Sequence, residues 1–386
     1  MFRTSFIEIS KQHYRNNLDF IKSVVGNNVR ISSVIKGNAY GHGLEEFMPM
    51  AQDCGINHFS VFSADEALRI HPLLNPGVVV TIMGDVYGEA LEWAISSGIE
   101  FYVFDRFRLE KAVEIAKKVG VKAKIHIELE TGMNRTGFEP SDITRLSKFL
   151  NENKDYLSIQ GCCTHFAGAE NIANYPRIKN QIKVFKMGVA VLAKNDINPT
   201  YIHACCSAAV MRFPEMHYNM VRVGIMQYGF WPNQEVFAEW SIQNDDKADP
   251  LRRLITWRSH VMSVKDVAPG KYIGYGSSYI AHRNMKIAIV PVGYSQGFSR
   301  SLSNHGRVLI GNNRQGVVGI VNMNSIAVDV SELSKVKPGD EVVLIGRQGD
   351  KELAVSSFGE FAEMMNYELL TRLPYVIPRL IIEDKK

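Results

Sequence analysis

The stretch RISSVIKGNAYGHGLEEFMPMAQDCGINHFSVFS, residues 30–63, indicates how this chain folds. It begins with a β-prone run that ends at Lys36 and closes with a second β-prone run from His58 to Ser63. Between them, Gly43 to Cys54 has the apolar spacing of an amphipathic helix. Two short strands joined by a helix of this length are typical of parallel strands with a helical crossover. The stretch therefore predicts one βαβ unit.

The same alternation continues to about residue 235. We expect eight strands, at Arg30 to Lys36, His58 to Ser63, Val78 to Met83, Glu100 to Asp105, Ala123 to Glu130, Ser158 to Phe166, Tyr201 to Ser207 and Met220 to Gly229. Helices are expected between them, at Gly43 to Cys54, Ala64 to Leu73, Arg106 to Val119, Ser141 to Asn153 and Arg177 to Lys194. Eight such units predict an N-terminal (β/α)8 TIM-like barrel.

The pattern changes after residue 245. β-prone runs then follow one another with turn signals between them, and a single helix is expected around Phe358 to Leu370. This part predicts a mainly antiparallel β domain. We therefore expect an α/β plus β fold, with a barrel at residues 1–245 and a β domain at residues 246–386.

The composition excludes several classes of protein. Hydrophobic residues make up 46% of the chain, but no apolar run is long enough to span a membrane. The 44 basic and 40 acidic residues are spread without a basic block, so we expect no nucleic-acid partner. Glu8 interrupts the only early apolar stretch, which argues against a secretory signal and predicts a cytoplasmic protein. The five cysteines lack a C-x-x-C pair, so we expect reduced thiols and no metal site.

Active groups of such barrels lie at the C-terminal ends of the strands. The first expected strand ends at Lys36, which is followed by Gly-Asn-Ala-Tyr-Gly-His-Gly. A lysine on an ordinary surface is only a solvated charge. At the end of an apolar strand, partial desolvation would instead lower its pKa and favour an imine with a carbonyl cofactor.

Residues 36–43 resemble the cofactor-lysine motif of the alanine racemases. Eight further segments follow in the order found in that family, so that the resemblance covers essentially the whole chain: Glu130 to Phe138, Thr164 to Ala167, His203 to Ala209, Val221 to Ile225, Tyr275 to Tyr279, Pro291 to Gly297, Val321 to Met323 and Asn366 to Glu368. The resemblance implies a pyridoxal-phosphate-dependent racemase that interconverts L- and D-alanine, whose D-alanine usually serves cell wall biogenesis. It also implies a head-to-tail homodimer that shares its active sites.

The resemblance also implies roles for single residues. Lys36 would carry the cofactor and act as one base, and Tyr275 would act as the opposed base, because racemisation removes a proton from one face of Cα and returns it to the other. Arg222 would face the pyridine nitrogen and keep it unprotonated, because arginine does not give up its proton. The remaining cofactor-binding residues would be Tyr40, His165, Ser207, Gly224, Ile225 and Tyr367, and the substrate-binding residues Arg135 and Met323. No metal is expected.

Several positions depart from the family pattern. Glu128 stands where many members have a carbamylated lysine, and Cys206 replaces an asparagine. Asn322 and Asn324 flank Met323 in place of cysteine and aspartate. These changes leave the preferred amino acid open, and serine is an alternative to alanine.

Three other classes of function remain possible at this point. A decarboxylase or a D-amino-acid aldolase could share the fold, although decarboxylases pair the pyridine nitrogen with an acid rather than with Arg222. A non-catalytic cofactor-binding protein would resemble the barrel alone, whereas residues 246–386 carry Tyr275 and Met323. A sugar- or phosphate-metabolising barrel would make the lysine motif a coincidence.

Overall fold

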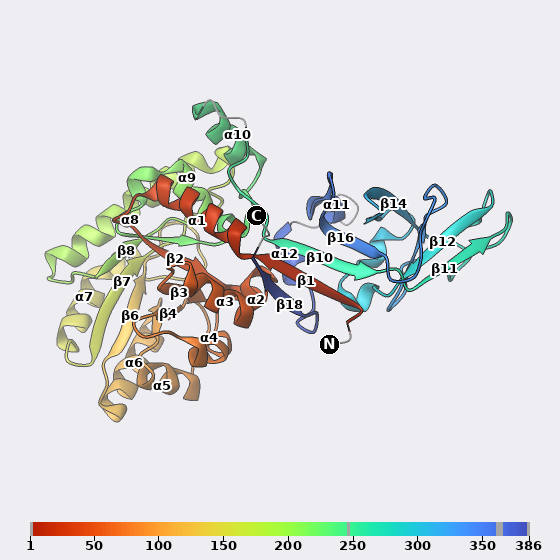
Figure 1. The fold of residues 1–386 in the computed structure, drawn as a ribbon. Coiled ribbons are helices and arrows are strands. Elements are labelled where there is room, and N and C mark those ends of the chain that lie inside the picture. The colour runs from red at the N-terminus through yellow and green to blue at the C-terminus, as the bar shows by residue number, and fades with distance from the viewer. Residues whose placement is uncertain (1–2, 245–247, 360–365, 384–386) are drawn as a thin grey trace. The chain divides into compact units, whose positions relative to one another are not determined.

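The computed structural model describes residues 3–244, 248–359 and 366–383 (Figure 1). The chain forms two compact units. The barrel unit comprises His13–Lys36 and Met48–Arg253, and the β unit comprises Met1–Gln12, Gly37–Phe47 and Leu254–Lys386. The chain thus passes between the units more than once, and residues 1–12 and 37–47, which the sequence analysis grouped with the barrel, lie in the β unit.

The barrel unit is built on eight parallel strands, which confirms the predicted (β/α)8 architecture (Figure 1). They are β2 (Arg30–Val34), β3 (His58–Val61), β4 (Val79–Ile82), β5 (Glu100–Val103), β6 (Ala123–Glu128), β7 (Leu157–Cys163), β8 (Tyr201–His203) and β9 (Met220–Val223). Their order is β8-β7-β6-β5-β4-β3-β2-β9. The seam between β8 and β9 has no ladder, but the Arg222 N–H donates to the Cys205 carbonyl at 3.0 Å. The barrel is therefore nearly closed.

One helix precedes the first barrel strand, and the others follow barrel strands along the chain. They are α1 (Lys11–Val25), α3 (Leu44–Asp53), α4 (Ala64–Ile70), α5 (Glu89–Ser96), α6 (Arg106–Val119), α7 (Ile143–Glu152), α8 (Tyr175–Lys194), α9 (Ser207–Arg212) and α10 (Gln234–Gln243). Helix α6 shows why these segments start and stop where they do. Asp105 caps its first turn by accepting from the Arg108 N–H at 2.8 Å, and Gly120 ends it at a φ of 72°. Its inner face buries apolar side chains such as Leu109 and Val113.

A left-handed turn follows β2 directly. In the short segment α2 (Lys36–Tyr40), Gly37, Asn38 and Ala39 have φ between 51° and 62°, and Tyr40 has a φ of 52°. Consecutive left-handed residues are costly for L-amino acids, so their neighbours must hold them in place. The Gly41 N–H donates to the Gly37 carbonyl at 3.0 Å, and the Asn38 side chain accepts from the Leu44 N–H at 2.9 Å.

The β unit contains one large sheet rich in antiparallel pairs, as predicted. Its strands are β1 (Ser5–Ser10), β10 (Ile255–His260), β11 (Ser263–Val267), β12 (Met285–Val290), β13 (Arg307–Ile310), β14 (Asn313–Val318), β15 (Ile326–Asp329), β16 (Glu341–Gln348), β17 (Lys351–Leu353) and β18 (Arg379–Ile382). The order is β11-β12-β15-β14-β13-β16-β10-β1-β18, with β17 beside β16. Strand β1, which we did not expect, pairs antiparallel with β10 and parallel with β18.

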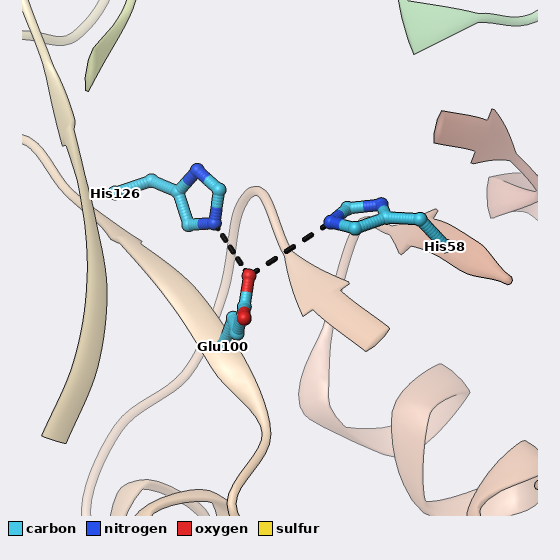
Figure 2. A group of neighbouring side chains, drawn as sticks. All are labelled: His58, Glu100 and His126. Carbon is cyan, nitrogen blue, oxygen red and sulfur yellow. Dashed lines mark hydrogen bonds and ion pairs between the residues drawn. The ribbon is translucent and has the colours of Figure 1, made fainter. Parts of the chain in front are cut away.

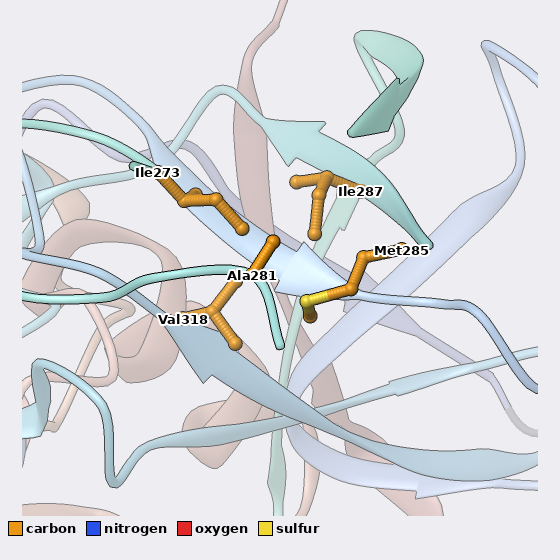
Figure 3. Packing of buried hydrophobic residues seen from close by; sticks show 5 residues of the cluster. All are labelled: Ile273, Ala281, Met285, Ile287 and Val318. Atoms are coloured by element: carbon orange, nitrogen blue, oxygen red, sulfur yellow. The ribbon is translucent and has the colours of Figure 1, made fainter. Parts of the chain in front are cut away.

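A compact apolar cluster stabilises the part of this unit around β12 and β14. Ile273, Ala281, Met285, Ile287 and Val318 are all buried and converge in one place (Figure 3). Met285 and Ile287 lie two residues apart on β12 and therefore face the same side of the sheet.

The helix expected around Phe358 to Leu370 lies partly outside the described residues. On either side of that gap the structure has α11 (Ser356–Gly359) and α12 (Asn366–Thr371). Among the described residues, no helix combines the length and the apolar character that a membrane span requires.

Candidate active site

Lys36 follows the first barrel strand, at the C-terminal end where these barrels carry their active groups. Its side chain is exposed, yet surrounding protein atoms desolvate the amine. This desolvation, followed by the positive charges of Arg135 and Arg222, lowers the pKa of Lys36, and Glu66 opposes the shift only in part. No described residue forms a hydrogen bond or an ion pair with the amine. The amine of Lys36 is thus deprotonated, and so nucleophilic, more often than that of an ordinary surface lysine.

The Arg222 guanidinium is buried and fixed by four hydrogen bonds. Its Nη1 donates to His203 Nδ1 at 2.6 Å and to the His203 carbonyl at 2.9 Å. Its Nη2 donates to the carbonyl of Thr164 at 2.8 Å and to that of Ala204 at 3.2 Å. Both terminal nitrogens are occupied in this way. Among the described contacts, Nε is the donor that remains for a further acceptor.

His165 lies among the positive charges of the site. Burial lowers its pKa to about 3, and the charges of Arg222, Arg135 and Lys36 act in the same direction. The imidazole is therefore neutral at physiological pH and can take part in hydrogen bonds without adding charge.

Ser207 connects the ends of two neighbouring segments. It is the first residue of α9, after β8, and its buried hydroxyl accepts from the Gly224 N–H, after β9, at 3.0 Å. Ile225 follows at once and begins a short 3-10 turn that ends at Tyr228. Hydroxyl and backbone N–H groups after the seventh and eighth strands are where barrels of this kind often bind phosphate.

Arg135 is exposed in the loop that follows β6. Burial raises the pKa of Glu128, at the end of β6, while Arg135 and a hydrogen bond from the Thr136 hydroxyl at 2.8 Å oppose the rise. Glu128 and Arg135 therefore interact electrostatically, but the direct partner of the carboxylate is Thr136. Glu130 holds the same loop, since its side chain accepts from the backbone N–H groups of Gly132 and Asn134.

Four predicted site residues belong to the β unit. The rings of Tyr40 and Tyr367 have their centroids 6.1 Å apart, so the structure brings these two together. Tyr275 is 74% exposed and Met323 is 56% exposed. The Met323 carbonyl accepts from the Ser295 hydroxyl at 2.8 Å.

The departures beside Met323 have specific partners. The Asn324 amide donates to the Ser295 hydroxyl at 2.8 Å, and the Asn322 carbonyl accepts from the Tyr294 N–H at 3.0 Å. The two asparagines thus help to fix the turn that carries Met323.

Sequence analysis missed a line of polar side chains inside the barrel. The ring of His126, on β6, lies between Glu100 on β5 and His203 on β8. Its Nε2 is 2.7 Å from Glu100 Oε2, and its Nδ1 is 2.9 Å from His203 Nε2. His58 lies on the other side of the same carboxylate (Figure 2). A sequence signal did exist, because an ionisable residue inside a doubly buried parallel strand must have a partner.

The chain was also compared with known proteins. The sequence profile of the alanine racemase N-terminal domain matches residues 9–232, and that of the C-terminal domain matches residues 254–381. An alanine racemase from Leptospira interrogans is 31% identical over 381 residues, which are 98% of this chain and 96% of that protein. One from Halothermothrix orenii is 32% identical over 377 residues, with 98% and 96% coverage.

Solved structures give the same result. The alanine racemase from Bacillus anthracis with bound L-Ala-P has a TM-score of 0.89 and 28% identity, and the match covers 100% of this chain and 97% of that one. Both parts of the chain thus match one family of isomerases, over nearly their whole length. The chain belongs to the alanine racemase family.

Proposed function

We propose that this enzyme interconverts L- and D-alanine with pyridoxal phosphate held on Lys36. The observation that carries the proposal is the Lys36 amine, which has a lowered pKa, no partner among the described residues, and the fixed guanidinium of Arg222 as an electrostatic neighbour. The reaction is inferred from the family to which the chain belongs. Lys36 and Arg222 are groups that this reaction needs.

The residues present fit the cofactor. Lys36 would bind its aldehyde carbon, and the Nε donor of Arg222 suits the pyridine nitrogen. Ser207, Gly224 and Ile225 would hold its phosphate, together with the phenols of Tyr40 and Tyr367. When bound, pyridoxal phosphate supplies an electron sink that makes the Cα–H bond of the substrate more acidic.

The protein's own groups then move the proton. Lys36 takes or returns it on one face of Cα, and Tyr275 does so on the other face. Arg222 cannot give up its proton, so it would keep the pyridine nitrogen of the bound cofactor unprotonated and the electron sink weak. His165 is neutral and would assist Tyr275 by hydrogen bonding, while Arg222 supplies the positive charge. Arg135 and the backbone N–H of Met323 would bind the substrate carboxylate.

A head-to-tail homodimer is part of the proposal. Three exposed aromatic side chains follow barrel strands β3, β4 and β5, and they are 53%, 63% and 56% exposed: Phe62, Tyr87 and Phe107. The rings of Tyr87 and Phe107 stack with centroids 6.0 Å apart. These three side chains form an apolar rim at the end of the barrel that carries Lys36. This rim, and the exposed Tyr275 and Met323 of the β unit, favour contact with a second copy of the chain, which would bury them. A cytoplasmic location and a role in cell wall biogenesis complete the proposal, by resemblance to the family.

The first experiment follows the optical rotation of L-alanine, L-serine and a panel of other L-amino acids with the purified enzyme and added cofactor. Alanine should racemise fastest, and Lys36→Ala should abolish both turnover and cofactor retention. Faster turnover of another amino acid would replace alanine as the substrate. No racemisation by an enzyme that retains the cofactor on Lys36 would overturn the proposal.

The substrate preference has one structural reason to differ from that of the relatives. Cys206 is an electrostatic neighbour of Lys36, so its replacement of asparagine changes the polarity beside the reacting amine. We therefore expect measurable turnover of serine in the same panel. Turnover of alanine alone would contradict this expectation.

The dimer is tested by mixing two inactive variants. Lys36→Ala and Tyr275→Phe subunits are unfolded and refolded together, and each is also refolded alone as the control. If each site takes Lys36 from one protomer and Tyr275 from its partner, random mixing should restore about a quarter of the normal activity, in heterodimers with one intact site. No restoration would contradict shared sites.

A further inference from the structure

A line of hydrogen bonds inside the barrel joins Arg222 to a buried carboxylate. Arg222 Nη1 lies 2.6 Å from His203 Nδ1, His203 Nε2 lies 2.9 Å from His126 Nδ1, and His126 Nε2 lies 2.7 Å from Glu100 Oε2. All four residues are buried. They come from four strands, β9, β8, β6 and β5, so the line crosses the barrel interior.

The chemistry of the groups fixes the direction of every bond in this line. A guanidinium only donates, so His203 Nδ1 must accept and carry no proton. Burial, and then the charge of Arg222, lowers the pKa of His203 well below its usual value, so its single proton sits on Nε2. That proton is donated to His126 Nδ1. The proton of His126 is therefore on Nε2 and is donated to Glu100.

The far end of the line is negative. Burial by itself raises the pKa of Glu100, but the hydrogen bond from His126 and the nearby ring of His58 outweigh burial and lower the pKa well below the usual carboxylate value. The line therefore runs from a buried cation through two neutral imidazoles to a buried anion. A second proton on His126 would set two N–H groups against each other and break the line.

We propose that Glu100, acting through His126 and His203, is a buried counter-charge of Arg222 and a positioning residue for racemisation. The line holds the guanidinium in one orientation and offsets part of its positive charge. Arg222 is then a weaker electron-withdrawing partner for the pyridine nitrogen than an uncompensated arginine. The catalytic consequence rests on the proposed function, whereas the proton positions do not.

Other groups that face Glu100 do not lie on the line. Thr81 Oγ1 donates to Glu100 Oε2 at 3.3 Å, and His58 Nε2 lies 3.8 Å from the same oxygen (Figure 2). The other ring nitrogen of His58 lies 2.9 Å from the Ser32 hydroxyl. These residues support the carboxylate, but the hydrogen bonds of the described residues give them no path to Arg222 other than through Glu100, and they therefore provide matched controls.

The proton positions are read by neutron diffraction from crystals of the deuterated holoenzyme. We expect deuterium on Nε2 of both His203 and His126, none on either Nδ1, and none on Glu100. Deuterium on His203 Nδ1, or a protonated Glu100, would overturn the proposal. A stoichiometric metal ion bound by His58, Glu100 and His126, found by elemental analysis, would overturn it as well. This measurement decides the proton positions even if the enzyme does not racemise alanine.

The second arm compares Glu100→Gln with Thr81→Val and His58→Asn. Glu100→Gln removes the charge and allows the amide to reverse the line. It should lower kcat at least about tenfold while KM for alanine changes less than about threefold. Each control should change kcat less than about threefold.

A third measurement is the rate at which the bound cofactor is lost to side reactions, relative to the rate of racemisation. Because Arg222 loses its counter-charge in Glu100→Gln, the visible absorption of the bound cofactor should decay faster per racemisation event, through side reactions. Equal losses in all three variants, or an unchanged ratio of decay to racemisation, would show a merely structural role and overturn the proposal. Normal kcat in Glu100→Gln would do the same.

Discussion

The pKa values of single residues in the site depend on their surroundings more than on their residue type. Lys36 and His165 both have lowered pKa values, because burial and nearby positive charges disfavour their protonated forms. The result is a site whose amine and imidazole are both easier to deprotonate than in water. Arg222, in contrast, keeps its charge, because its pKa is raised.

Tyr275 provides the clearest prediction at this scale. Removing its hydroxyl should lower racemisation by about a hundredfold or more, since a positioned acid or base is worth about 10² to 10⁴ in rate. Tyr272→Phe is the matched control, because that ring is also exposed, at 58%, and lies three residues away. Racemisation rates of the two variants, measured with L-alanine and with D-alanine, check the prediction. Equal rates would remove Tyr275 from the mechanism.

At the scale of elements, the left-handed turn after Lys36 depends on a close approach by the chain. A Cβ built on Gly41 would lie 1.8 Å from the Leu370 carbonyl oxygen, and Gly41 also has a φ of +82°. No residue other than glycine can occupy such a position without displacing the backbone. The turn is therefore held by α12 as well as by its own hydrogen bonds.

Gly41→Ala should consequently destabilise the protein by at least about 2 kcal/mol, because it adds both a clash and a strained φ. Gly316→Ala is the control, since its Cβ would meet nothing within 4 Å. Chemical denaturation of both variants measures the difference in unfolding free energy. A Gly41→Ala variant as stable as Gly316→Ala would show that the turn can shift without cost.

Elements whose signals are local in the sequence could be predicted, whereas elements that depend on partners far along the chain could not. The barrel strands were found because each is a β-prone run between turn signals, although β9 ends at Val223 rather than at Gly229. Gly224 leaves the strand at φ −101° and ψ −101°, and a 3-10 turn follows. Strand β1 was missed because its partners, β10 and β18, come hundreds of residues later.

The same limit applied to the site. Lys36 and Arg222 stand in recognisable motifs, so their positions could be predicted. Glu100 and His126 are single polar residues within apolar strands, and only the closure of the barrel brings them into line with His203.

At the scale of the whole molecule, buried histidines predict acid sensitivity. Burial lowers the pKa of His42 to about 4 and that of His165 to about 3, and it also lowers the pKa values of His58 and His203. The unfolded chain binds these protons below a pH of about 6.5, whereas the folded protein does not. Stability should therefore be lost as the pH falls from about 6.5 towards the folded pKa values.

Each such histidine costs up to about 2 kcal/mol at pH 5. Thermal unfolding measured between pH 8 and pH 5 should show a melting temperature that falls below pH 6.5. Replacing His42 with glutamine should make that fall shallower, because one of the protons is no longer taken up. A melting temperature that is constant across this range would contradict the prediction.

The pairing of β1 with β10 and β18 has a consequence for synthesis on the ribosome. Every barrel strand has left the ribosome long before residues 379–382, so the barrel can assemble while β1 still lacks a partner. Residues 5–10 are thus made before the barrel but locked in place after it. A nascent chain arrested near residue 275 should protect the barrel from proteases and leave residues 5–10 open to cleavage, until β10 and β18 arrive and pair with β1.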